Sequence, residues 1–128
     1  MRRILPALFL TASALVGLAI PAAAQDADMR KENFNLDEDV AISGYDPVAY
    51  FKSNTAIMGQ SSLAVFHQGV VYHFSSAANK EEFKKNPSRY EPQYGGWCAY
   101  AMGAKGSKVS VNPETFKIVN GKLFLFYN

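Results

Sequence analysis

The chain has 128 residues, with 13 lysines and arginines against 11 aspartates and glutamates, and so a net charge of +2. This near balance excludes the clustered basic surface that binding to nucleic acid or to an anionic membrane requires. The single cysteine excludes an intramolecular disulfide, so one hydrophobic core must stabilise the fold without a covalent cross-link.

The first 24 residues have the three-part pattern of a secretory signal of bacterial type. Arg2 and Arg3 form a basic start, residues 4–20 are largely apolar, and Pro21 is followed by three alanines, which suit a signal peptidase. This pattern favours cleavage after Ala24 over a retained membrane anchor, and export to the periplasm or out of the cell. The two arginines would leave with the signal, and the mature chain would then carry eleven basic and eleven acidic residues.

The rest of the chain is long enough for a single domain. We expect a flexible N-terminal lead over 25–39, because this stretch is polar and mixed in charge, and a folded domain over 40–128. The domain would begin with a short strand over 40–43. Asp46, followed by a proline, predicts the start of a helix over 47–52, since aspartate caps free N–H groups and proline suits the first helical turn.

A hairpin is predicted next. Residues 63–67 and 70–74 are rich in strand-forming side chains and are separated by a glutamine and a glycine. A two-residue turn would place His67 and His73 on opposite faces of the hairpin, where they could not both bind one metal ion. We expect His67, beside the turn, to face solvent.

The second half of the domain alternates helix and hairpin. A serine cap and a closing proline bound a predicted helix over 77–86. The stretch over 91–106 has weak periodicity, and the residues around Trp97 fit either a strand or a helical turn. The clearest hairpin joins 116–119 to 122–127 across Asn-Gly, the favoured two-residue turn. The sequence therefore predicts an α+β fold, with a small antiparallel sheet of hairpins and short packed helices.

Three stretches of the domain form a joint pattern. They are the run from Gly44 to Phe51, the Tyr-His-Phe-Ser-Ser run that begins at Tyr72, and the Gly-Gly-Trp-Cys-Ala run that begins at Gly95. Together they resemble the YHS-domain family, in its small exported form. The resemblance implies a metal-binding domain, related to treble-clef metal domains that have lost their metal knuckle.

The metal site of the ATPase-linked YHS form is absent from this chain. In that form the ligands are cysteines, one directly after the phenylalanine of the Tyr-x-Phe pattern and another four residues on. Ser75 and Asn79 stand at the corresponding positions here. Because neither side chain is a good ligand for zinc or a soft metal, any metal site must use other residues.

Cys98 is the sharpest candidate for such a ligand, because a thiolate binds copper(I) and other soft metal ions. His73, inside the family pattern, and Met102 complete the predicted set, with copper as the expected metal and Met58 as an alternative partner. The competing interpretations are that Cys98 is a small buried hydrophobic residue and that His73 is structural. A blue-copper centre is disfavoured, since the histidines diverge and none follows Cys98.

Two other functions stay open. The first is a module for a small ligand or a protein partner, with an aromatic pocket and an outer surface formed by Phe124 and Phe126. The second is a small thiol enzyme that uses Cys98, although recognisable catalytic motifs are missing and we expect binding rather than catalysis. The residues predicted to line the pocket are Tyr45, Tyr72, Trp97 and Tyr100.

Overall fold

The computed structural model describes Pro6 and residues 17–128 of the chain. The basic start and most of the apolar segment of the predicted signal lie outside these residues, so the signal stays a prediction. Within the described residues, no helix is both long enough and apolar enough to cross a membrane.

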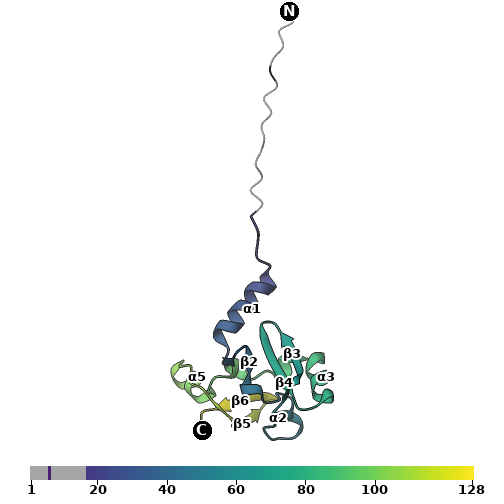
Figure 1. The fold of residues 1–128 in the computed structure, drawn as a ribbon. Coiled ribbons are helices and arrows are strands. Elements are labelled where there is room, and N and C mark those ends of the chain that lie inside the picture. The colour runs from purple at the N-terminus through teal and green to yellow at the C-terminus, as the bar shows by residue number, and fades with distance from the viewer. Residues whose placement is uncertain (1–5, 7–16) are drawn as a thin grey trace, which may run out of the picture.

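Helix α1 (Ala22–Asn33) occupies much of the stretch that was expected to be a flexible lead. Its alanines favour helix formation, and it projects from the rest of the domain toward the N-terminal end of the chain (Figure 1). None of its residues is buried. Arg30 secures its last turn by donating to the carbonyl oxygen of Gln68 at 2.9 Å and to Glu91 at 2.6 Å. Because these partners are distant in the sequence, the local composition could not show that the end of the helix is held against the domain.

A four-stranded sheet lies at the centre of the domain, in the order β1-β2-β4-β3. Val40 of β2 pairs in parallel with Val71 of β4, whereas the other neighbours are antiparallel. The sheet is therefore mixed rather than antiparallel throughout, because the chain crosses from β2 to the outer strand β3 before it returns as β4. Its strands are β1 (Leu36–Asp37), β2 (Val40–Ala41), β3 (Gln60–His67) and β4 (Val70–Phe74).

The β3–β4 hairpin has the predicted two-residue turn. Gln68 and Gly69 both have positive φ values, 46° and 89°, as a tight hairpin turn of this kind requires. The register pairs His67 with Val70 and His73 with Ala64. Because side chains alternate along a strand, the two histidines lie on opposite faces, as expected.

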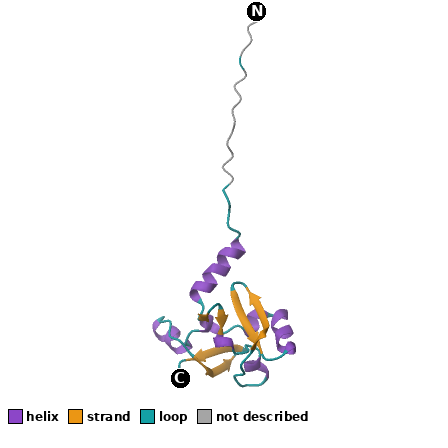
Figure 2. Cartoon of the chain, in the orientation of Figure 1, coloured by secondary structure: helices purple, strands orange, loops and turns teal. Residues whose placement is uncertain are grey.

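Short helices surround the sheets (Figure 2). Ser76 accepts a hydrogen bond from the backbone N–H of Asn79 at 3.1 Å, and so caps α3 as predicted. The residues after Trp97 form a helix, which decides between the two alternatives left open for this stretch. The helical elements are the 3-10 turns η1 (Ile42–Gly44) and η2 (Gln93–Gly96), and the α-helices α2 (Ala49–Lys52), α3 (Ala77–Lys85), α4 (Pro87–Tyr90) and α5 (Ala99–Lys105).

The C-terminal hairpin forms a separate two-stranded sheet of β5 (Asn112–Val119) and β6 (Lys122–Phe126). Its turn at Asn120 and Gly121 has the predicted positive φ values, 51° and 72°. Leu123 and Leu125 of β6 are fully buried, whereas Tyr127, just after the strand, is exposed. The core between the elements contains the fully buried side chains of Tyr50, Tyr72, Phe74, Phe83, Leu123 and Leu125. The α+β class is therefore confirmed.

Candidate functional site

The buried carboxylate of Asp46 connects the start of α2 to the segment that joins β4 to α3. Its Oδ1 accepts hydrogen bonds from the backbone N–H groups of Val48 at 2.8 Å and Ala49 at 3.2 Å, and so satisfies the turn that leads into α2, which begins at Ala49 rather than at residue 47. Its Oδ2 accepts from the N–H and hydroxyl groups of Ser75 at 2.8 and 2.6 Å, and from the amide of Asn79 at 2.9 Å. Ser75 and Asn79 therefore hold a structural carboxylate.

The thiol of Cys98 lies at the start of α5 and is 3% exposed. Burial raises the pKa of the thiol, but the backbone N–H groups of Ala101, Tyr127 and Tyr100 lower it by more, so the pKa of Cys98 lies below its ordinary value. The N–H of Tyr127 donates to Sγ at 3.4 Å. The fold thus makes ionisation of this thiol easier than in a free cysteine.

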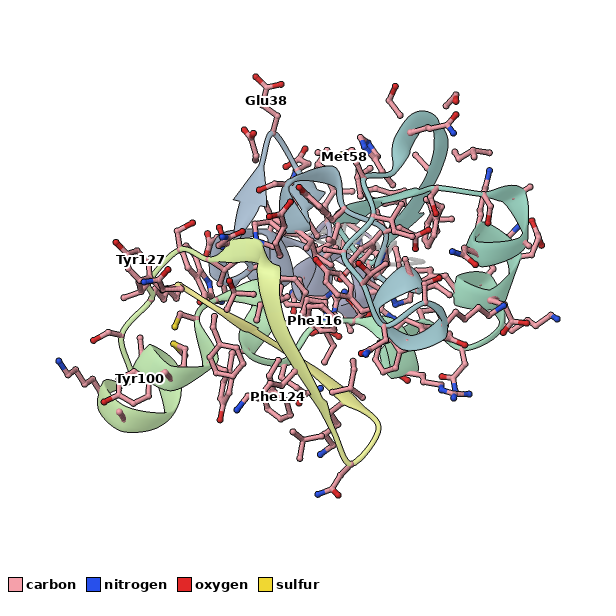
Figure 3. All side chains as sticks on the ribbon, turned by 90° about the horizontal axis from the view of Figure 1, so that it is seen from below. Glu38, Met58, Tyr100, Phe116, Phe124 and Tyr127 are labelled. Carbon is pink, nitrogen blue, oxygen red and sulfur yellow. The ribbon has the colours of Figure 1, made fainter. Side chains whose placement is uncertain are left out.

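Two largely apolar cavities meet at this thiol. Both are lined by Cys98, Tyr100 and Tyr127, and their volumes are about 330 and 310 Å³. Phe126 also lines the first cavity, so the outer aromatic face of β6 contributes to this cavity near the end of the strand. Figure 3 shows Tyr100 and Tyr127 on the same side of the domain. Volumes of this size suit a small organic molecule.

Met102 lies in a different cavity, of about 210 Å³, which it lines together with Tyr94 and Trp97. The indole Nε1 of Trp97 donates to the carbonyl oxygen of Asn33 at 2.6 Å, which fixes the ring against the end of α1. Met102 lies one helical turn after Cys98, and its N–H donates to the carbonyl oxygen of Cys98 at 3.0 Å.

His73 lines a further cavity, of about 260 Å³, on the face of the sheet away from His67. Asp37 and Glu38, at the turn between β1 and β2, and the thioether of Met58 lie around the same cavity. Among the described residues, no hydrogen bond or ion pair engages the His73 ring, whereas Nε2 of His67 lies 3.7 Å from a carboxylate oxygen of Glu91.

The three predicted metal ligands therefore line different cavities, and His73 lies on β4, apart in the sequence from Cys98 and Met102 of the α5 segment. In the part of the chain that the structure describes, no group of three His, Cys, Asp or Glu side chains is arranged to hold a metal ion. A metal site in this region must use fewer ligands of these types, or include methionine.

The aromatic candidates are dispersed in the same way. Tyr72 is fully buried, and its hydroxyl donates to Oε2 of Glu91 at 2.6 Å. Burial, reinforced by the charge and hydrogen bond of Glu91, raises the pKa of Tyr72 well above its usual value. Tyr45 pairs with Met58 in an isolated β-bridge, while Trp97 and Tyr100 line separate cavities. No single aromatic pocket unites the four.

Glu91 is an organising residue that sequence reasoning missed. It accepts hydrogen bonds from Arg30 and Tyr72, and it lies beside His67, which is half-buried with its ring 6.0 Å from that of Phe83. The expectation that His67 faces solvent was therefore wrong, because the face that it shares with Tyr72 is the core face. Glu91 stands in a stretch without periodicity and gave no local signal.

Comparison of the chain with protein-family models, with curated proteins and with solved structures finds no match.

Proposed function

We propose that this chain is an exported YHS-like protein that binds a metal ion at the cavity of His73, with copper as the expected metal. The observation that carries the proposal is the combination of an unengaged imidazole with a neighbouring thioether and two acidic side chains in one cavity. Imidazole is the commonest metal ligand among side chains, and thioether sulfur favours copper(I). The resemblance to the YHS family supports the same function.

The proposal revises the predicted ligand set. Cys98 and Met102 lie in other cavities, so His73 is the one predicted ligand on which the proposal depends. Asp46 is unsuitable as a ligand, because its side chain is fully buried and both carboxylate oxygens already accept hydrogen bonds.

The test is an anaerobic copper(I) titration of the purified protein against a competing chelator. We expect His73→Asn to weaken binding and His67→Asn to leave it unchanged, since the second histidine lies on the opposite face of the same hairpin. Absence of copper binding by the wild-type protein would overturn the proposal.

A second candidate function is supported by the acidified thiol of Cys98 beside two apolar cavities. This arrangement suits a small organic ligand or thiol chemistry. In that case Cys98→Ala would abolish the activity or the binding of the ligand and leave the copper titration unchanged. If Cys98→Ser lost copper binding and His73→Asn kept it, the metal site would instead be at the thiol.

A further inference from the structure

We infer that the site selects copper in its reduced state, and that Nδ1 of His73 and Sδ of Met58 are the protein ligands. The inference rests on the proposed function and deepens it, because it names the oxidation state and a ligand outside the predicted set. Three features of the cavity support it: the position of the two donor atoms, the rigidity of the backbone beneath them, and the donor chemistry.

Both donor atoms lie close to Gly44. A Cβ atom built on this glycine would lie 3.3 Å from Nδ1 of His73 and 3.6 Å from Sδ of Met58. Both donors therefore lie within 3.6 Å of a single point beside the backbone, and the lack of a side chain at Gly44 keeps that point open. Met58 is 56% exposed, so its flexible side chain is free to move toward the imidazole.

The backbone beneath the donors has an unusual conformation. Three successive residues, Ile42, Ser43 and Gly44, have positive φ values of 55°, 51° and 84°. A β-branched residue such as isoleucine rarely adopts this region, and such strain is concentrated at functional sites. The left-handed turn carries Gly44 to the floor of the cavity.

Hydrogen bonds hold the segment of Met58 against this turn. The N–H of Gly59 donates to the carbonyl oxygen of Gly44 at 2.8 Å, and the N–H of Asp46 donates to that of Ile57 at 2.8 Å. These bonds fix the backbone immediately before and after Met58.

Gly59 also joins the two ligand segments. A Cβ atom at Gly59 would lie 2.5 Å from the carbonyl carbon of His73, so the two backbones are in direct contact. Strand β4 and the Met58 segment therefore share a rigid backbone base, above which the side chain of Met58 is free to turn toward the imidazole.

The chemical types of the two donor atoms determine which metal ion the cavity prefers. One imidazole and one thioether suit soft copper(I), whereas zinc and copper(II) require additional nitrogen or oxygen ligands. Asp37 and Glu38 line the cavity, but the described residues hold no triad of His, Cys, Asp and Glu side chains that could supply such ligands. The two carboxylates contribute negative charge that attracts a cation. Figure 3 shows Glu38 and Met58 on the same side of the domain.

The experiment compares anaerobic copper(I) and zinc(II) titrations of the wild-type protein with those of Met58→Leu, His73→Asn and Met102→Leu. We expect each of the first two variants to lose about tenfold or more in copper(I) affinity, since even loss of a partner of a metal ligand has an effect of this size. Met102→Leu is the matched control and should bind as the wild type does. Leucine preserves the volume of methionine, so folding should be retained.

X-ray absorption of the copper-loaded protein gives an independent readout. Cys98→Ser removes the one thiol, so a copper–sulfur distance that persists in this variant must come from methionine. It should disappear in the double variant Cys98→Ser with Met58→Leu. Copper(I) binding that is unchanged in Met58→Leu would overturn the inference and leave the proposed function standing. Absence of copper binding by the wild type would overturn both, and zinc bound as tightly as copper(I) would overturn the selectivity.

Discussion

The hydroxyl of Tyr72 donates a hydrogen bond of 2.6 Å to Oε2 of Glu91, and Arg30 donates to the same oxygen at the same distance. Tyr72 is a fully buried residue of β4, whereas Arg30 belongs to the projecting helix α1. One carboxylate therefore connects the outermost helix to the centre of the core.

Tyr72→Phe tests the hydrogen bond. We expect it to lower the free energy of unfolding near neutral pH by about 1.5–3 kcal/mol, the range for hydrogen bonds to charged groups. The raised pKa of Tyr72 means that this stabilisation is present below the ordinary tyrosine pKa of about 10 and is lost as the pH rises through the folded-state value. Urea unfolding across this pH range measures the difference. Tyr100→Phe, at an exposed position, should have little effect.

Arg30→Ala should release α1 from the domain. We expect faster amide hydrogen exchange over 25–33 and a loss of about 1–2 kcal/mol in the free energy of unfolding, because Glu91 loses a charged donor in a partly buried pair. Lys31→Ala is the matched control on the same helix, since its ion pair with Asp39 is longer, at 3.4 Å, and largely exposed. Equal exchange rates in the two variants would contradict the role assigned to Arg30.

Asp46→Ala should be more damaging than either change. It leaves backbone and side-chain donors of Val48, Ser75 and Asn79 without their acceptor inside the protein. We expect a loss of about 3 kcal/mol or more, because each buried unsatisfied group costs about 1–3 kcal/mol. Urea unfolding with Asp28→Ala as an exposed control provides the measurement. A loss below 1 kcal/mol, the scale of exposed interactions, would show that the carboxylate is not a structural centre.

The thiol of Cys98 should ionise at a lower pH in the folded protein than in the urea-unfolded protein. The ultraviolet absorbance of the thiolate, measured against Cys98→Ala, reports this ionisation directly. Since the folded pKa is the lower one, the contribution of the thiolate to stability is absent below that value, grows between the two values, and is complete above the ordinary thiol pKa of about 8.5. If the thiol ionised at the same pH in the folded and the unfolded protein, the effect of the backbone N–H groups on its pKa would be disproved.

Local chemistry predicted the parts of the fold that depend on a few neighbouring residues. Asn120 and Gly121 adopt the predicted turn, Ser76 caps its helix, and Asp46 caps the start of α2, because each effect is determined within four residues. The parallel pairing of Val40 with Val71 had no such local signal, since it depends on the path of the intervening chain.

The same dependence on distant segments explains why His73 alone, of the three predicted metal ligands, belongs to the proposed site. Cys98, His73 and Met102 were chosen by ligand chemistry, but the place of His73 in a different cavity from Cys98 and Met102 depends on packing between distant segments. Met58 was considered only as a partner of the thiol. Met58 and His73 both lie near Gly44, which adopts a left-handed turn that the surrounding sequence did not predict.

The burial of Cys98 has a consequence for the protein if it is exported as proposed. In an oxidising compartment, an accessible lone thiol would link chains covalently. With 3% of its surface exposed, Cys98 can reach a second chain only when the domain opens. Disulfide-linked dimers would therefore accumulate with each opening of the domain, and a non-reducing gel would show them.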